Sequence, residues 1–327
     1  MIASVAAGPL IDSQGYKVGM VLGLALIALA LSFLPSSRGY GQVIACLLVL
    51  GLGGGTIVTG ANSLASDLGG AQRAAALNFL NLFFGLGGLA TPFILANLLR
   101  GNSTRLCYLA ALATAATLAV NAAVSMPAAK SAGGIALTEA GRLLGHPALW
   151  LLAALLFLYV ACEVGVWNWL TRHLIAQGIP EKRALNILSL GFALGLLIGR
   201  AAVAPLFRSL SPETVTLTAA VLMTVTTWLA LQTRNPAVAW VAVFAAGISM
   251  APVFPTVLAI TGGAFGAARA TAIGIVAMFG WVGLAVSSPI IGAIAGEDPK
   301  GLKRALLILP GFSALMILVN LALRAAL

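Results

Sequence analysis

The feature that most constrains the fold is a series of uninterrupted apolar segments, each about 20 residues long, the length that an α-helix needs to cross a bilayer. Hydrophobic residues make up 61% of the chain and charged residues 8%, whereas about a quarter of the residues in soluble domains are charged. Membrane β-barrels alternate apolar and polar residues, and these segments do not. The sequence therefore predicts an all-α polytopic membrane protein, which we expect in a bacterial-type plasma (inner) membrane.

Ten full membrane helices are predicted after a shorter apolar stub at residues 1–11. The expected spans lie near 18–34, 40–65, 74–98, 105–126, 149–172, 185–207, 214–232, 237–261, 270–295 and 304–324. The longest polar interval, 127–147, is predicted to be a central cytoplasmic linker. It would separate an N-terminal bundle (1–126) from a C-terminal bundle (148–327).

The two predicted bundles resemble each other at a constant offset near 196 residues, which indicates an internal repeat. Residues 7–10 (AGPL) match residues 203–206 (VAPL), and Gly51 matches Gly247. Because the offset spans six helices, an even number, both copies have the same orientation in the membrane. The sequence thus predicts a parallel repeat.

The repeat also predicts that part of its first copy lies before residue 1. The counterpart of the helix at 149–172, and half of the counterpart of the helix at 185–207, are not in the chain. We therefore expect that the first helix and half of the second are missing, through a misplaced start codon or a decayed or incomplete gene. Alternatively, residues 1–11 form an interfacial segment of a naturally short protein.

Residues 8–17 (GPLIDSQGYK) resemble the short loop that follows the second helix of major facilitator transporters. In that family the loop is cytoplasmic, and its charges bridge helix ends that rearrange during alternating access. The resemblance implies gating or conformational roles for Gly8 and Asp12. Ser13 stands where the family usually has a basic residue, so the expected charge network is weaker than the family pattern. Basic residues are slightly more numerous on the opposite face of the membrane, so charge alone favours the reverse orientation.

A finer resemblance points to the fucose-permease-like (fucose:proton symporter) branch of that family. Its features are YVACE at 159–163, WNW at 167–169, IGR at 198–200, FPT at 254–256, Asn62, ALN at 76–78 and FGLGG at 84–88. The resemblance implies two six-helix bundles that act as a monomer without a cofactor. It also implies proton-coupled uptake of a sugar or related small polar solute.

Glu163 is a carboxylate inside the apolar run at 148–174. A charged group at the centre of a membrane helix costs roughly 2.5 to 3.5 kcal/mol, and such residues usually face a partner or a translocation path. We predict that Glu163 binds substrate or couples protons; the alternative is a structural hydrogen bond. Trp167 lies four residues later on the same helix face and offers an apolar plate for a sugar ring, or belongs to an aromatic belt. Asn168 is polar and nearby, but points to a different face.

Other polar or aromatic residues in apolar segments are further candidates for the substrate site or for contacts between helices. They are Arg200, Asn62, Asn78, Asn81 and Trp281. Pro252 and Pro255 interrupt a predicted span, which suits a gating helix or a static kink.

Two other functions remain open: an efflux antiporter for drugs or metabolites, and a truncated product that no longer transports. The first is suggested by residues 85–92, which loosely resemble an antiporter motif but lack its Gly-Pro pair. The cysteines and histidines form no nucleophile or metal pattern, so we expect neither an enzyme nor a metal site. The net charge of +10 is spread over loops and forms no stripe for a nucleic acid.

Overall fold

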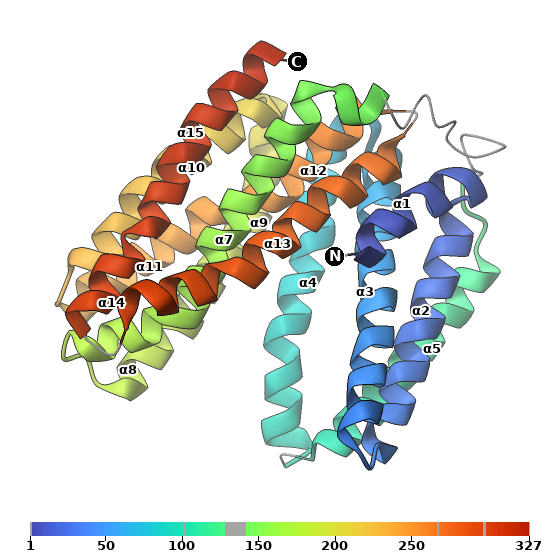
Figure 1. The fold of residues 1–327 in the computed structure, drawn as a ribbon, viewed down its shortest axis with the longest axis horizontal. Coiled ribbons are helices and arrows are strands. Elements are labelled where there is room, and N and C mark those ends of the chain that lie inside the picture. The colour runs from blue at the N-terminus through green and yellow to red at the C-terminus, as the bar shows by residue number, and fades with distance from the viewer. Residues whose placement is uncertain (1, 101, 128–141, 267, 297–298, 327) are drawn as a thin grey trace. The chain divides into compact units, whose positions relative to one another are not determined.

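The computed structural model describes the chain except for residues 1, 101, 128–141, 267, 297–298 and 327. All the regular secondary structure in the described residues is helical (Figure 1). The elements are α1 (Ile2–Gln14), α2 (Tyr16–Phe33), η1 (Leu34–Ser36), α3 (Tyr40–Gly69), η2 (Gly70–Gln72), α4 (Arg73–Phe93), η3 (Ile94–Leu98), α5 (Ser103–Ala123), α7 (Pro147–Ala176), α8 (Glu181–Asn186), η4 (Ile187–Ala193), α9 (Leu194–Val203), η5 (Ala204–Arg208), α10 (Pro212–Gln232), α11 (Pro236–Met250), α12 (Val253–Ala264), α13 (Arg269–Ala295), α14 (Pro299–Leu306) and α15 (Ile308–Ala326).

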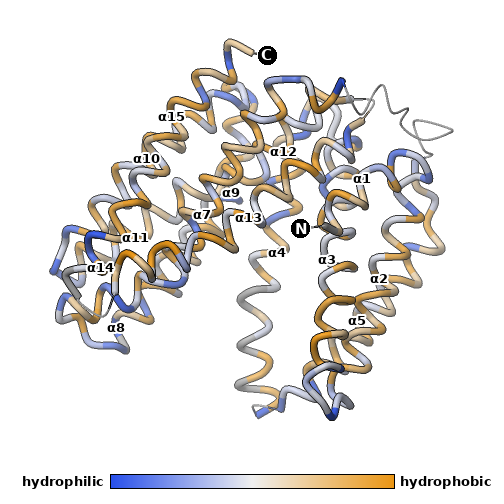
Figure 2. Tube along the Cα trace, in the orientation of Figure 1, coloured by the Kyte–Doolittle hydropathy of each residue, from blue (hydrophilic) through white to orange (hydrophobic). Residues whose placement is uncertain are grey.

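Each of the ten predicted spans lies mostly in helix, although the span at 105–126 continues past the end of α5 at Ala123 and the spans at 237–261 and 304–324 are interrupted at 251–252 and 307. Nine helical segments in the described part of the chain are long and apolar enough to cross a membrane. One of them, Tyr40–Gly87, contains two of the predicted spans, because only the short turn η2 separates α3 from α4. Figure 2 shows the apolar stretches along these helices, with the hydrophilic residues concentrated near their ends.

Polar residues begin several helices where the sequence predicts loops. Asn102 caps α5 by accepting from the backbone N–H of Arg105 at 2.9 Å. Ser211 and Asn235 cap α10 and α11, each followed by a proline at the first helical position. Such side-chain oxygens satisfy N–H groups that have no partner within the helix, and proline has no N–H to leave unsatisfied.

The described residues form two compact units. The first comprises residues 1–68, 86–146 and 262–278, and the second comprises 69–85, 147–261 and 279–327. In the first unit α2 packs along α5, and the two helices lie side by side in Figure 1. In the second unit α7 packs against α15, and α10 packs against both α11 and α15.

The predicted division of the chain into bundles at 1–126 and 148–327 stays a prediction. Most of the expected linker, 127–147, lies outside the described residues. The two compact units follow a different division, because residues 69–85 group with the second unit and residues 262–278 with the first.

Candidate functional site

A close contact between α9 and α11 positions the first candidate residue, Arg200. Gly195 and Gly199 lie one turn apart on α9, facing Gly247 and Ala251. A Cβ built at Gly199 would lie 2.6 Å from the Cβ of Ala251, and one at Gly247 would lie 3.1 Å from the Cα of Gly195. Only residues without a side chain allow two helix backbones to approach this closely. Arg200 follows directly after this seam.

Arg200 is buried, with 7% of its surface exposed. One terminal nitrogen, Nη1, donates to the backbone carbonyl of Asn81 on α4 at 3.2 Å. Gly85 lies beside the guanidinium, and a Cβ there would make an ordinary van der Waals contact of 3.5 Å with Nη1. Another guanidinium nitrogen of Arg200, Nε, is buried and has no hydrogen-bond partner. The contact of Arg200 is therefore with the main chain of Asn81, another of the predicted candidates, and its role in a substrate site stays a prediction.

Tyr159, Glu163 and Trp167 occupy one face of α7 at intervals of four residues. Tyr159 is fully buried, and its hydroxyl lies within reach of the side chains of Glu163 and Arg200. Glu163 and Arg200 are the charged groups that act on this hydroxyl, so both lie near it. Glu163 itself is half-buried. Although Glu163 and Arg200 are both described, no ion pair joins them.

Trp167 leaves 37% of its surface exposed and meets the edge of the buried Phe192, with ring centroids 5.2 Å apart. Asn168 points elsewhere, because its Nδ2 donates to the hydroxyl of Ser288 on α13 at 2.7 Å. Trp281 lies half-buried on α13. Trp167 thus stays with Glu163 on one face of α7, whereas Asn168 contacts a neighbouring helix.

The asparagines differ in their surroundings. Asn78 is fully buried; its Nδ2 donates to the carbonyl of Ala74 at 2.8 Å and to the hydroxyl of Thr256 at 3.3 Å, while its Oδ1 has no partner. Asn81 is also buried on α4, three residues later and on the same side. Asn62 is buried in α3, in the other compact unit, and donates to the carbonyl of Val58 at 2.7 Å.

Pro252 and Pro255 interrupt a helix, as predicted. α11 ends at Met250 and α12 begins at Val253. Proline has no N–H, so the carbonyls four residues earlier, at Ile248 and Ala251, lose their usual helical donors. The break lies next to the seam, because Ile248 and Ala251 are the residues that Gly199 approaches.

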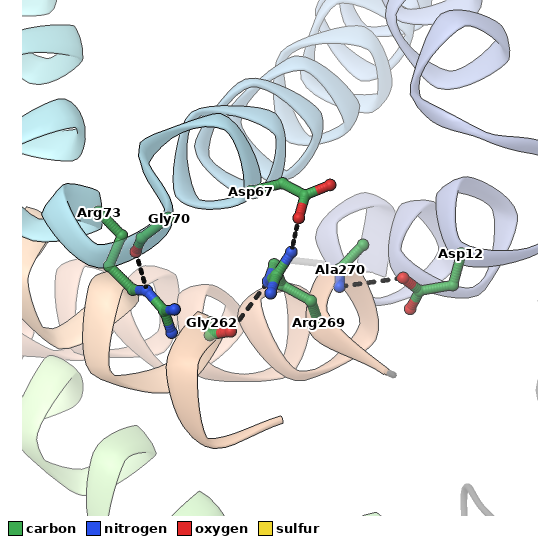
Figure 3. Close-up of polar contacts among 7 residues, drawn as sticks. All are labelled: Asp12, Asp67, Gly70, Arg73, Gly262, Arg269 and Ala270. Atoms are coloured by element: carbon green, nitrogen blue, oxygen red, sulfur yellow. Dashed lines mark hydrogen bonds and ion pairs between the residues drawn. The ribbon is translucent and has the colours of Figure 1, made fainter. Parts of the chain in front are cut away.

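A second set of polar residues lies in the first compact unit, where Asp12 caps the N-terminus of α13. One carboxylate oxygen accepts from the N–H of Ala270 at 3.1 Å (Figure 3). The other accepts from the N–H and the hydroxyl of Thr271 at 2.8 and 2.7 Å. Gly8 lets α1 approach, since a Cβ there would lie 2.5 Å from the Cα of Thr271. A negative charge at this end of a helix is favourable because of the helix dipole.

Asp12 stands at the end of α1, outside the nine candidate spans. Burial raises the pKa of its carboxyl above the ordinary value, and the hydrogen bonds from Thr271 and Ala270 and the charge of Arg269 offset this only in part.

Arg269, the first residue of α13, forms an ion pair with Asp67 at the end of α3, and its Nε donates to the carbonyl of Gly262 at 2.8 Å (Figure 3). The buried Tyr16 lies close enough for both charges to act on its hydroxyl. Arg269 also acts on Asp12. One buried cation therefore lies between two carboxylates.

The Major Facilitator Superfamily model matches residues 1–288. The chain belongs to the major facilitator superfamily. It is therefore an integral membrane protein of a family of transporters, and not an enzyme. A search of curated proteins finds no match to the sequence.

Solved structures of other superfamily members share the fold. A crystal structure of the transporter FucP in the outward conformation matches with a TM-score of 0.85 at 19% identity, over 99% of this chain and 86% of that one. A variant of the Escherichia coli fucose:proton symporter FucP gives 0.84 at 19% identity, over 99% and 87%. The human organic anion transporter MFSD10 gives 0.78 at 17% identity, over 97% and 80%.

Sequence reasoning about this superfamily member missed Tyr159 as a site residue, and it missed the pair of Asp67 with Arg269. The 196-residue offset could have found the arginine, because it relates Arg269 to Arg73. Both arginines begin a helix and donate Nε to a backbone carbonyl of the preceding turn or helix; for Arg73 the acceptor is Gly70 at 2.9 Å (Figure 3). The same four-residue spacing that links Glu163 to Trp167 leads back to Tyr159.

Proposed function

We propose that this superfamily member is a secondary active transporter that takes up a sugar or related small polar solute together with protons by alternating access. The observation that carries the proposal is the face of α7 that presents Tyr159, Glu163 and Trp167 beside the buried Arg200. Likeness of fold to a fucose:proton symporter supports the same function. We further propose that the protein acts as a monomer in a bacterial-type plasma (inner) membrane.

Glu163 is proposed to bind the coupled proton or a solute hydroxyl. It is half-buried within a membrane span, forms no ion pair with Arg200, and lies near the buried Tyr159 hydroxyl. Ionisable residues inside membrane spans usually mark substrate or ion pathways, which supports a role in transport. The exposed surface of Trp167, one turn away, offers an apolar plate to a sugar ring.

The proposed gate uses Asp12, Gly8 and the prolines. The cap that Asp12 forms on α13 joins the end of α1 to the start of α13 through hydrogen bonds. We propose that these bonds break and form again together during the transport cycle. The interruption at Pro252 and Pro255 supplies a second place where a span can bend. Asn62, Asn78, Asn81, Asn168 and Trp281 are proposed as supporting polar or aromatic groups for solute or helix contacts.

The test is transport by the purified chain in proteoliposomes that hold a pH-sensitive dye. Neutral hexoses, including fucose, are compared with cationic drugs under an imposed proton gradient. We expect internal acidification with a hexose and none with a drug. Drug-driven proton exchange without any hexose response would favour efflux antiport and contradict the proposal.

The role of Glu163 is tested with Glu163→Gln, and Glu181→Gln is the matched control because Glu181 is an exposed carboxylate at the start of α8. We expect Glu163→Gln to lose proton-coupled uptake and Glu181→Gln to keep it. Uptake by Glu163→Gln with wild-type rate and pH dependence would remove this residue from the mechanism.

A further inference from the structure

An apolar groove with a volume of about 160 Å³ lies in the second compact unit and is lined by residues of α9, η5, α10 and α11. Its lining includes the buried Val203 and Ala219 and the exposed Leu206, Leu210 and Leu222. Among the described residues that line it, only Thr218 and Ser249 have polar side chains. The groove therefore does not suit the small polar solute of the proposed transport function.

The groove opens towards the hydrocarbon of the membrane. Apart from Leu210, its lining comes from the three candidate spans Arg183–Arg208, Pro212–Gln232 and Pro236–Ala264. An apolar cavity of about 150 Å³ accommodates benzene, so a groove of this size accommodates a segment of about six carbon atoms of a lipid acyl chain. A chain that enters it exchanges one apolar environment for another, so the groove alone gives little preference among lipids. Any preference must come from the headgroup.

Arg208 lies at the end of the groove that reaches the membrane surface. It is exposed, and it is the last residue of its span. It stands between Leu206 and Leu210, which both line the groove, in a turn where the N–H of Leu210 donates to the carbonyl of Leu206 at 2.9 Å. Because long basic side chains at the end of a span extend to the headgroups, the guanidinium lies where a lipid phosphate would be.

Arg324 approaches the same end of the groove from α15. It is exposed, and its Nη2 donates to the hydroxyl of Thr214 on α10 at 2.8 Å. Thr214 lies one turn before the groove residue Thr218, on the same face of α10. The acidic residue at this end is Glu213, in the first turn of α10. The two arginines outweigh it by one positive charge.

We propose that the groove and the two arginines bind an anionic glycerophospholipid, with one acyl chain in the groove and the phosphate beside Arg208 and Arg324. Guanidinium groups bind phosphate oxygens through paired hydrogen bonds, and basic pockets between membrane helices bind anionic headgroups. The site includes Pro252 of the proposed gate but neither Glu163 nor Trp167. Lipid binding there does not depend on which solute the protein transports.

The test uses two photoreactive lipids, a phosphatidylglycerol and a phosphatidylcholine that carry the same diazirine-bearing acyl chain. Each is a minor component of phosphatidylcholine nanodiscs that hold the full chain, and labelled peptides are quantified by mass spectrometry after irradiation. One positive charge near a membrane surface favours an anionic lipid about fivefold, so we expect about fivefold more labelling of residues 199–222 by phosphatidylglycerol. Equal labelling by the two lipids, or no label on these residues, would overturn the proposal.

Arg208→Gln tests the contribution of the headgroup contact. Arg234→Gln is the matched control, because Arg234 is an exposed arginine just beyond the other end of α10. We expect Arg208→Gln to bring the two lipids to within about twofold of each other and Arg234→Gln to keep the preference of about fivefold. If both variants lose the preference equally, the net charge of the protein attracts the lipid and the proposed site is wrong.

Thr218→Trp tests the place of the acyl chain, because an indole at this exposed lining residue would fill part of the groove. Val221→Trp is the control: Val221 is exposed on α10 and does not line the groove. We expect Thr218→Trp to reduce labelling by phosphatidylglycerol several-fold and Val221→Trp to leave it unchanged. Equal labelling of the two variants would show that the chain lies elsewhere and would refute the proposal.

Discussion

Thr271 donates both its backbone N–H and its hydroxyl to the same carboxylate oxygen of Asp12, at 2.8 and 2.7 Å. The other oxygen accepts from the N–H of Ala270. Asp12 therefore caps α13 from a position 258 residues before Ala270 in the chain. Ala268, which precedes α13, has no side-chain oxygen to do so. The beginning of one span thus depends on a residue of another.

Asp12→Ala should destabilise the protein by about 1 to 2 kcal/mol, the usual cost of removing a helix-capping side chain. The measurement is the thermal unfolding midpoint of the purified protein in detergent. Ser13→Ala is the matched control, because the Ser13 hydroxyl donates only to the nearby carbonyl of Leu10 at 3.2 Å. A midpoint for Asp12→Ala equal to that of Ser13→Ala would show that the cap adds no stability.

The free energy of unfolding should depend on pH through the titration of Asp12. Its folded-state pKa is raised, with burial as the main cause, above the ordinary value of 3.8. Between 3.8 and the raised pKa the folded protein holds a proton that the unfolded chain has released, so the stability contributed by this group rises as pH falls through that window and is lost as pH rises.

The comparison is wild type with Asp12→Asn, which cannot titrate at this position. The difference between their unfolding midpoints should move in favour of the wild type as pH falls from 7 towards 4. The slope is at most about 1.4 kcal/mol per pH unit, the effect of one proton. A difference that stays flat, or moves in favour of the variant at low pH, would contradict the assignment.

Breaking the part-buried pair of Asp67 with Arg269 should destabilise the protein, and removing Arg269 should cost more than removing Asp67. The cost should be below the roughly 3 to 5 kcal/mol of removing one partner of a fully buried ion pair. Arg269→Gln leaves Asp12 and Asp67 without their shared cation, whereas Asp67→Asn leaves Arg269 with Asp12 still nearby. We expect the order of stability wild type, then Asp67→Asn, then Arg269→Gln, in thermal unfolding.

A double-mutant cycle separates the pair from its surroundings. Asp67→Asn combined with Arg269→Gln should be less destabilised than the sum of the single changes, because no unpaired partner remains. Additive losses would mean that the two side chains do not interact in the folded protein.

Gly199→Ala should perturb the seam between α9 and α11. The new Cβ would lie 2.6 Å from the Cβ of Ala251 and 2.9 Å from the carbonyl oxygen of Ile248, so a backbone must move. Overpacking of this kind typically costs about 1 to 3 kcal/mol. Gly311→Ala on α15 is the control, because a Cβ there meets nothing within 4 Å. A Gly199→Ala protein as stable and as active in uptake as Gly311→Ala would refute the close contact.

The membrane helices were predictable because each depends on a local property, a run of apolar residues ended by residues such as Asn235 and Pro236 that favour a turn and a helix start. The break near Pro252 was predictable for the same reason, since proline acts on its own helix. The assignment to the major facilitator superfamily followed from the order of such local patterns and is confirmed by the family match.

Contacts across the chain were harder to predict. Arg200 donates to a backbone carbonyl 119 positions away, and every residue has a carbonyl, so the sequence carries no mark of this acceptor. Tyr159 is a site candidate because its buried hydroxyl lies near Arg200. This proximity depends on how α7 packs and cannot be read from the sequence. In the sequence, Asp67 is a charged residue at the end of a predicted helix, and nothing there indicates that it pairs with Arg269.

The seam at Gly195 and Gly199 has a mechanical consequence. Because the backbones of α9 and α11 approach closely at these glycines, a change in the tilt of one helix would require the other to move with it. Arg200 directly follows Gly199, one of the glycines at this close contact. Such a joint movement of α9 and α11 would also displace the guanidinium of Arg200.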